Sequence, residues 1–140
     1  MAFVLDASVA LRWLMKDGTE SDLAYANFVL DQFLDSNIQV HVPSHWPLEI
    51  TNVMLRSERL TLINQAASET FLDMIRAAPV NIDMATAEQA LRVTLALARE
   101  FRLTPYDAAY LELAMRLECP LATLDKDLRR AAERAGVEVV

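Results

Sequence analysis

Apolar side chains in the first half of the chain follow two spacings, one typical of strands and the other of helices. Short apolar runs predict strands at 3–5 and 38–42, the first ending at Asp6 and the second at Pro43. Recurrence of apolar residues every three or four positions predicts four helices in the same part of the chain, over 8–15, 20–35, 47–60 and 64–77. The predicted order is strand, two helices, strand, two helices.

The second half of the chain continues in this way with shorter strands. Residues 80–83 and 121–123 predict short strands, and residues 137–140 predict a final one. Thr104 and Pro105 suit the cap and the first turn of a helix. Helical spacing predicts three helices here, over 86–101, 106–117 and 126–135.

Alternating strands and helices without a repeat or linker predict one α/β domain over residues 1–140, with a small, mainly parallel central sheet surrounded by helices. Only a short link, 102–105, joins the helices 86–101 and 106–117. This link indicates that the strand 80–83 is not a simple parallel neighbour and that the helix before the link crosses obliquely. The order of the strands stays open.

The composition agrees with one helix-rich domain and reduces the number of function classes that fit the chain. Of 140 residues, 54% are hydrophobic and two are glycine, which argues against disorder and against a turn-rich all-β fold. The net charge of −7 argues against a passive nucleic-acid binder, but it suits a metal-dependent nuclease or a protein with a basic partner.

Cysteine usage and the absence of long apolar runs indicate where the protein works. The single cysteine, Cys119, excludes an internal disulfide and points to a buried structural thiol in a reducing compartment. The sequence has neither a signal-peptide pattern nor an apolar run of the ~20 residues that a membrane span needs. We therefore expect a cytoplasmic protein without membrane association.

Four acidic residues fall where predicted strands end or predicted helices begin. They are Asp6, Glu49, Asp107 and Asp125. In parallel α/β domains the carboxyl ends of the strands and the amino ends of the crossover helices share one edge of the sheet, where ligands bind. The sequence thus predicts that these four carboxylates project to the same edge.

Ionised carboxylates gathered at one edge need compensation. At ~4 Å each pair repels by about 4 kcal/mol at an effective dielectric of about 20. Raised pKa values, basic side chains or hard cations would relieve this repulsion, and only the cations also create a catalyst for phosphodiester hydrolysis. Oxygen ligands favour Mg²⁺ or Mn²⁺ over Zn²⁺. Taken singly, each acid also suits a role as a helix cap or first-turn acid.

Four short segments, in this order, resemble motifs of the PIN-domain family and in particular of the VapC-type toxins of toxin–antitoxin pairs. They are Val4-Leu5-Asp6-Ala7-Ser8, Glu49-Ile50-Thr51-Asn52, Thr104-Pro105-Tyr106-Asp107-Ala108 and Leu121-Ala122-Thr123-Leu124-Asp125. The resemblance spans nearly the whole chain. It implies a metal-dependent endoribonuclease that forms a homodimer and binds a cognate, VapB-like antitoxin.

The resemblance also assigns roles to individual residues. The catalytic and metal-binding set is Asp6, Glu49, Asp107 and Asp125, with Ser8, Asn52 and Thr123 as polar support. Asp127 is ambiguous, because it either shares the role of Asp125 or is an ordinary first-turn acid. His45 has no triad-like context and is assigned no chemistry.

Basic and aromatic residues near the same edge offer candidate contacts to the substrate. The candidates for RNA phosphates are Arg12, Lys16, Arg56 and Arg59, which equally suit solvated helix faces. Trp13 and Trp46 suit either base stacking or the core, and helical spacing favours the core for Trp13.

Other functions remain open from the sequence. A PIN nuclease of RNA processing or decay, or a PIN module that only binds partners, would share these motifs. A receiver-like Mg²⁺-binding signalling domain would need an adjacent acidic pair after the first strand, where the chain has Asp6 alone. The RNA target, the number of metal ions and the oligomeric state cannot be read from the sequence.

Overall fold

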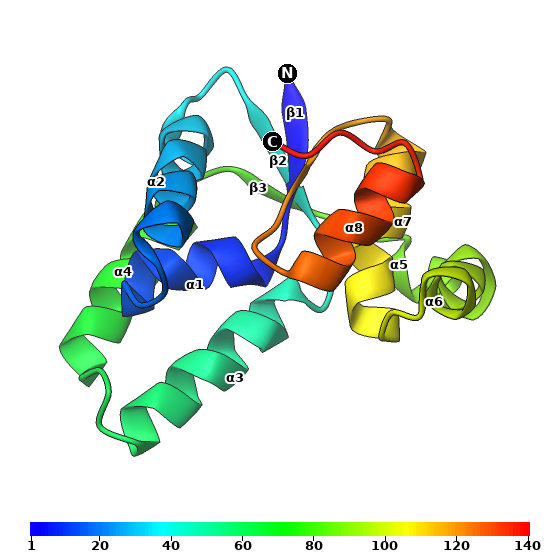
Figure 1. Ribbon diagram of the computed structural model, residues 1–140. Coiled ribbons are helices and arrows are strands. Elements are labelled where there is room, and N and C mark those ends of the chain that lie inside the picture. Colours follow the sequence, from blue (N-terminus) through cyan, green and yellow to red (C-terminus); the bar gives the residue numbers. More distant parts are fainter.

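A computed structural model describes all 140 residues and contains one parallel sheet of four strands in the order β3-β2-β1-β4 (Figure 1). The strands are β1 (Ala2–Leu5), β2 (Gln39–Val42), β3 (Val80–Ile82) and β4 (Leu121–Ala122). β1 is central, pairing Ala2 with Gln39 of β2 and Val4 with Leu121 of β4. The predicted α/β class with a parallel central sheet is confirmed.

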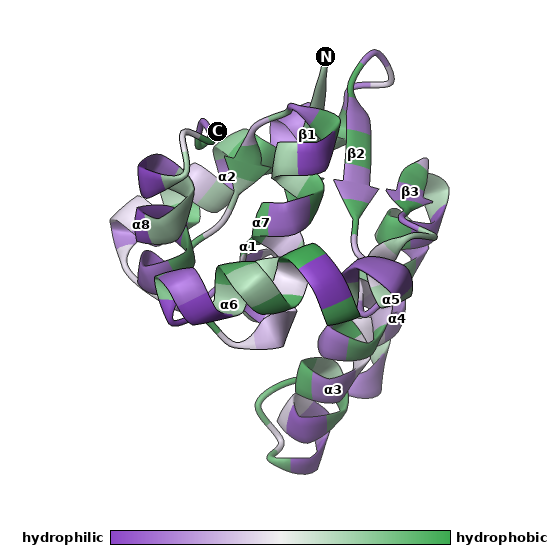
Figure 2. Cartoon of the chain, turned by 90° about the vertical axis from the view of Figure 1, so that its right-hand side faces the viewer, coloured by the Kyte–Doolittle hydropathy of each residue, from purple (hydrophilic) through white to green (hydrophobic).

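Helices pack on both sides of this sheet. They are α1 (Ala7–Met15), α2 (Glu20–Leu34), α3 (Trp46–Arg59), α4 (Gln65–Ala77), α5 (Thr86–Gln89), the π-helical turn η1 (Ala90–Thr94), α6 (Leu95–Phe101), α7 (Pro105–Leu117) and α8 (Lys126–Arg134). In Figure 1, α2 and α4 lie to the left of the sheet, while α7 and α8 lie to its right. Figure 2 shows hydrophilic and hydrophobic residues in each helix of the right-hand side, as expected of helices with one buried and one solvated face.

Local signals in the sequence explain where several helices begin. The side chains of Thr19, Asn64 and Thr104 each accept a hydrogen bond from a backbone N–H in the first turn that follows. Pro47 and Pro105 occupy the first turns of α3 and α7, where a helix does not need the missing N–H. These caps orient the amino ends of the helices, and α3 and α7 each carry a predicted site acid in that turn.

The core is one cluster of 29 buried residues around β1 and α7. Tyr110 and Leu111 of α7 are completely buried, as are Val4 and Leu5 of β1. Trp13 lies in the core, as its spacing predicts, and donates from Nε1 to the Ala26 carbonyl at 2.8 Å. None of the helices combines the length and the apolar character that crossing a membrane requires.

The strand at 80–83 differs from the prediction. β3 is a parallel neighbour of β2, with Val40 opposite Val80 and Val42 opposite Ile82. The expectation that it is not a simple parallel neighbour was wrong. β3 joins the edge beside β2, whereas β4 lies at the other edge, so the chain crosses the whole sheet through α5, η1, α6 and α7. A short link between two helices is compatible with so long a crossover.

The predicted final strand at 137–140 is reduced to a single bridge between Leu121 and Val139. Leu121 N–H donates to the Glu138 carbonyl at 2.9 Å, and Val140 N–H donates to the Leu121 carbonyl at 3.0 Å. Because β4 has only two residues, it offers too few backbone groups for a longer ladder.

Candidate active site

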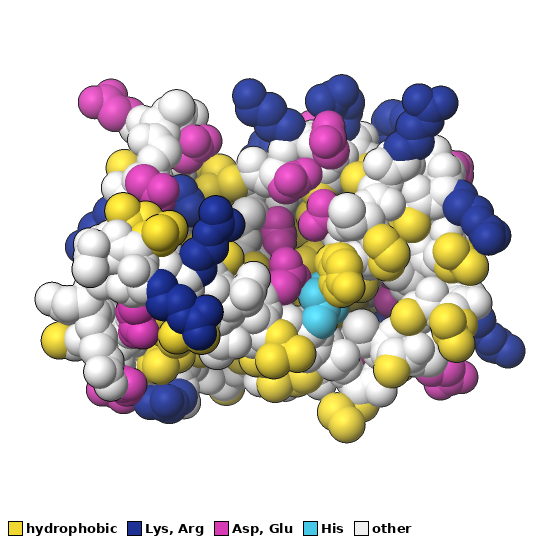
Figure 3. Space-filling view, turned by 90° about the horizontal axis from the view of Figure 1, so that it is seen from below, with side chains coloured by type: hydrophobic (Ala, Val, Ile, Leu, Met, Phe, Trp, Pro, Cys, Tyr) yellow, Lys and Arg dark blue, Asp and Glu magenta, His cyan; other side chains and the backbone are white.

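The four predicted acids lie at the carboxyl edge of the sheet. Asp6 follows β1 directly, Glu49 and Asp107 lie in the first turns of α3 and α7, and Asp125 is the N-cap of α8. In Figure 3, acidic side chains gather in a central hollow of this face beside a histidine, and Lys and Arg side chains lie farther out. The arrangement follows from the parallel topology, which places strand ends and helix starts together.

Asp6 occupies the N-cap position of α1 but its side chain makes no capping hydrogen bond. Its Oδ2 instead accepts hydrogen bonds from Ser8 Oγ at 2.6 Å and from Thr123 Oγ1 at 2.7 Å. Those two hydroxyls are oriented in turn by the backbone, since Ser8 Oγ accepts from Leu124 N–H and Thr123 Oγ1 accepts from Asp125 N–H, both at 3.0 Å. The carboxylate is thus held between two segments that are distant in sequence, and its Oδ1 makes no hydrogen bond within the chain.

Burial raises the pKa of Asp6 to about 6, and repulsion by Glu49 and Asp107 adds to this effect while the Ser8 and Thr123 hydroxyls oppose it. The pKa of Asp107 is also raised, first by burial and then by repulsion from Asp125 and Glu49. The four carboxylates therefore sense one another electrostatically. Such perturbation of several acids in one place is typical of functional sites.

Glu49 is held by two residues to which the sequence interpretation assigned no role. Its Oε1 accepts from the Tyr110 hydroxyl at 2.6 Å and lies 3.0 Å from His45 Nε2. The same Nε2 lies 3.1 Å from the Tyr106 carbonyl, so two oxygen acceptors face this nitrogen. The signal for His45 was its position four residues before Glu49, on the same helical face. The partnership with Tyr110 joins residues 61 positions apart and had no local signal.

A Tyr110→Phe substitution tests whether this hydroxyl stabilises the site. Burial raises the pKa of Tyr110, so the hydroxyl stays protonated and donates to a charged acceptor. Removing it should lower the free energy of unfolding by about 1–2 kcal/mol in urea titrations. Tyr106→Phe is the control, because Tyr106 is 64% exposed and should leave the stability unchanged. Equal stabilities of the two variants would contradict this role.

Glu49 and Asp107 line a hollow of about 480 Å³. Its other lining residues are His45, Leu48, Asn52, Thr104 and Tyr106. The predicted supporting residue Asn52 therefore belongs to the same hollow. Asp125 caps α8, because its Oδ1 accepts a hydrogen bond from Leu128 N–H at 2.8 Å. The alternative prediction that Asp125 is a helix cap is therefore also confirmed.

The four carboxylates share an edge but do not converge as closely as the sequence argument assumed. No three acidic, histidine or cysteine side chains lie close enough together to hold one metal ion in this arrangement. The hydrogen bonds of Asp6, Glu49 and Asp125 each direct a carboxylate toward a different partner. The donors are nevertheless all oxygens, which suit hard divalent cations, and the Oδ1 of Asp6 is uncommitted.

Asp6 and Asp125 are not among the residues that line the hollow, and the remaining predicted residues also lie outside it. Asp127 is exposed and forms an ion pair with Arg130 at 3.3 Å. Arg12 is paired with Asp17, and Arg56 and Arg59 are in the last turn of α3. Lys16 is the exposed C-cap of α1, and none of the four predicted phosphate-binding residues lines the hollow.

A cationic residue that the sequence interpretation missed supports the strand end. Arg129 donates from Nη2 to the Thr123 carbonyl at 3.2 Å, and its guanidinium lies 5.2 Å from the centre of the Tyr25 ring. The Tyr25 hydroxyl accepts from Thr123 N–H at 3.3 Å. Together they position Thr123, which holds Asp6.

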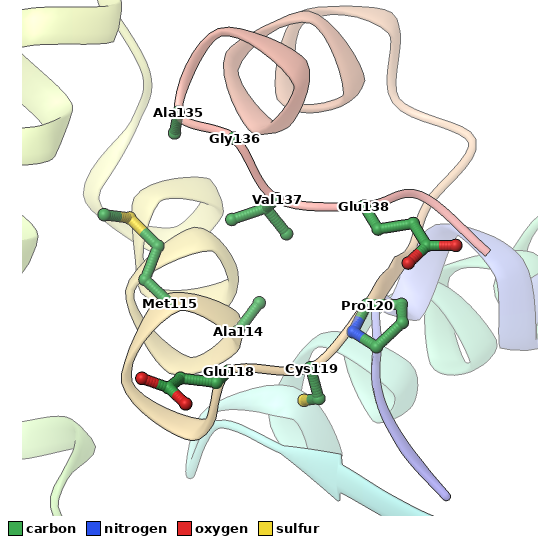
Figure 4. A pocket seen from close by; sticks show the side chains of 9 residues that line it. All are labelled: Ala114, Met115, Glu118, Cys119, Pro120, Ala135, Gly136, Val137 and Glu138. Atoms are coloured by element: carbon green, nitrogen blue, oxygen red, sulfur yellow. The ribbon is translucent and has the colours of Figure 1, made fainter.

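A second cavity, of about 400 Å³, lies at the other end of α7, where β4 begins (Figure 4). It is lined by Cys119 and by two carboxylates, Glu118 and Glu138, together with small and apolar residues. Burial raises the pKa of the Cys119 thiol, so the thiol stays neutral and weakly reactive. This cavity lacks basic groups and is separate from the acidic hollow.

Comparison with known proteins agrees with the fold. The family model described as "PIN domain" matches residues 3–134, and the chain therefore belongs to the PIN-domain family. PIN domains are generally nucleases that use divalent metal ions.

The fold is also similar to that of PAE2754 from Pyrobaculum aerophilum, known from a crystal structure, with a TM-score of 0.67 and 21% sequence identity. The match covers 94% of this chain and 79% of that chain. A search of curated proteins finds no match.

Proposed function

We propose that this protein is a Mg²⁺- or Mn²⁺-dependent endoribonuclease in which Asp6, Glu49, Asp107 and Asp125 form the metal-binding and catalytic set. The observation that carries the proposal is the state of Asp6. A buried carboxylate at a helix start would ordinarily act as a cap, yet Asp6 is held by two hydroxyls and has an uncommitted Oδ1. Burial raises the pKa of Asp6, and carboxyls with raised pKa values are common at functional sites, which supports the proposal.

Each residue of the proposed set would have its own role in binding the metal ion. Asp6 would be the central ligand, kept in one rotamer by Ser8 and Thr123. Glu49 and Asp107, which face the hollow, would complete the ligand set from α3 and α7. A divalent cation bound there would stabilise charge on the scissile phosphate and activate water.

Asp125 and Asn52 would assist the three ligands Asp6, Glu49 and Asp107. Asp125 raises the pKa of Asp107 by repulsion, which places it within electrostatic reach while one of its oxygens caps α8. Asn52 lines the hollow beside Glu49 and offers an amide that can bind water or a phosphate oxygen. Asp127 is not given a catalytic role, since it is exposed and paired with Arg130.

We further propose the finer role of a VapC-type toxin that acts in the cytoplasm as a homodimer and is inhibited by a VapB-like antitoxin. The support is the order of the four motifs and the net charge of −7, which suits a basic antitoxin segment over the acidic hollow. The alternative is a PIN nuclease of RNA processing or decay. A small antitoxin reading frame adjacent to the gene would favour the toxin.

Cleavage of total RNA by the purified protein with Mg²⁺, Mn²⁺ or EDTA tests the proposal. We expect discrete fragments with either cation and none with EDTA. Asp107→Asn should lower the rate by at least roughly a hundredfold. The matched control is Asp22→Asn, the acid at the corresponding third position of α2 after its cap Thr19, which lies outside the hollow and should retain the rate. Cleavage that persists in EDTA, or an undiminished Asp107→Asn rate, would rule out this mechanism.

A further inference from the structure

A third depression, of about 310 Å³, concentrates positive charge on an otherwise acidic molecule. It is lined by Phe101, Arg102, Asp127, Arg130, Ala131 and Arg134. Three arginines face one aspartate here, whereas the chain as a whole carries −7. A local charge opposite to that of the whole protein indicates an anionic ligand. We call this depression the arginine cleft.

Two of the three guanidinium groups have no acidic partner. The side chains of Arg102 and Arg134 form no ion pair and no hydrogen bond within the chain, and only the Arg130 side chain is paired, with Asp127 at 3.3 Å on the surface. Arg134 packs its guanidinium 5.4 Å from the centre of the Phe101 ring, which limits its motion and leaves its N–H edges open. The cleft therefore offers exposed guanidinium donors, and one guanidinium, that of Arg134, is held against an aromatic ring. A guanidinium fork matches the oxygens of a phosphate.

The arginine cleft lies on α8, whose cap is the site acid Asp125, and on α6, which a short turn joins to α7. α8 begins at its cap Asp125, and Arg130 and Arg134 follow at about 8 and 14 Å along the helix axis. Arg102 ends α6 immediately before the turn that leads to Asp107 in α7. Figure 2 shows α6 beside α8 on this side of the molecule, consistent with residues of both lining one cleft.

We propose that the arginine cleft binds backbone phosphates of the RNA strand whose scissile phosphate lies at the acidic hollow. This inference rests on the proposed ribonuclease function and adds the positioning subsite that this function needs. Arg102, Arg130 and Arg134 bind phosphates flanking the cut and offset the repulsion between RNA and the acidic surface. They replace Arg12, Lys16, Arg56 and Arg59, none of which lines either depression, as the main phosphate contacts.

Binding of a fluorescently labelled single-stranded RNA in EDTA, across a series of salt concentrations, tests the inference without requiring cleavage. Loss of two phosphate contacts in Arg130→Gln/Arg134→Gln should make the slope of log affinity against log salt shallower by roughly 1.4 and weaken binding about tenfold at low salt. The control is Arg76→Gln, an arginine on α4 that lies outside the cleft and should leave the slope unchanged. Thermal unfolding of each variant verifies folding.

The possible outcomes separate this inference from the proposed function. An Arg130- and Arg134-dependent slope in a protein that never cleaves RNA supports the cleft and refutes the nuclease. Cleavage with an unchanged KM and an unchanged salt slope in the double variant overturns the cleft and leaves the nuclease intact. Binding of polyglutamate instead of RNA, lost in the double variant, also overturns the inference and assigns the cleft to an acidic protein partner.

Discussion

Asp6→Asn is expected to abolish RNA cleavage and, at neutral pH, to make the folded protein more stable. The loss of cleavage should reach at least roughly a hundredfold, because a neutral amide is a poor ligand for a hard cation. The gain in stability follows from burial, which raises the pKa of the Asp6 carboxyl from 3.8 to about 6. Asparagine has nearly the same shape and can still accept from Ser8 and Thr123, without a buried charge.

The sign of the pH dependence follows from the direction of this pKa shift. Because the folded-state pKa of Asp6 lies above the unfolded value, the folded protein binds more protons between about pH 4 and pH 6. The contribution of Asp6 to the unfolding free energy therefore falls as the pH rises through this window. The difference between 3.8 and about 6 corresponds to a penalty of at most about 3 kcal/mol above pH 6, which the asparagine variant avoids.

Urea unfolding at pH 4 and pH 7.5 in EDTA, alongside cleavage assays with Mg²⁺, measures both effects. The stability advantage of Asp6→Asn should be present at pH 7.5 and largely absent at pH 4. Asp31→Asn, an exposed acid on α2, is the control and should change neither quantity. If Asp6→Asn instead destabilises the protein at pH 7.5, the carboxylate has a structural role and the functional assignment loses its main support.

Arg116→Met is expected to lower the free energy of unfolding by about 3 kcal/mol without involving the acidic hollow. Arg116 makes two hydrogen bonds to Glu112, through Nε at 2.7 Å and Nη2 at 3.1 Å. It makes two more to Asp83, through Nη2 at 2.7 Å and Nη1 at 3.1 Å. The arginine thus ties α7 to the segment that follows β3.

The size of this effect comes from the group left behind. The Glu112 side chain is only 4% exposed, so removing its partner leaves a nearly buried charge uncompensated. Breaking a buried ion pair costs about 3–5 kcal/mol, and the lower end applies because the Arg116 side chain is 29% exposed. Methionine retains most of the packing of the arginine stem, so the loss reports mainly on charge.

Chemical denaturation of Arg116→Met, Arg76→Met and the pair Arg116→Met/Glu112→Leu provides the test. Arg76 makes only exposed ion pairs, with Glu69 and Asp73, and its replacement should cost less than about 1 kcal/mol. The double variant should recover much of the lost stability, because it no longer buries an unpaired carboxylate. A loss that is equally large in Arg76→Met, or no recovery in the double variant, would show that the charge explanation is wrong.

The sequence predicted where the candidate site lies, but not how its side chains are arranged. Strand ends and helix starts placed Asp6, Glu49, Asp107 and Asp125 at one edge because topology dictates it. The sequence did not predict how closely the four carboxylates approach one another, because this depends on the hydrogen-bond partner of each carboxylate. Those partners are remote, such as Thr123 for Asp6 and Tyr110 for Glu49, and no periodicity connects them.

The sequence by itself determined the α/β class, the positions of nearly all helices and strands, and the placement of the acids at their ends, because spacing and capping are local properties of the chain. Only the tertiary structure decided that β3 pairs parallel to β2, that residues 137–140 contribute one bridge, and that three arginines of α6 and α8 share a cleft. Strand order and side-chain partners depend on contacts between residues far apart in sequence. Such contacts are selected by the packing of the whole core, which no local pattern specifies.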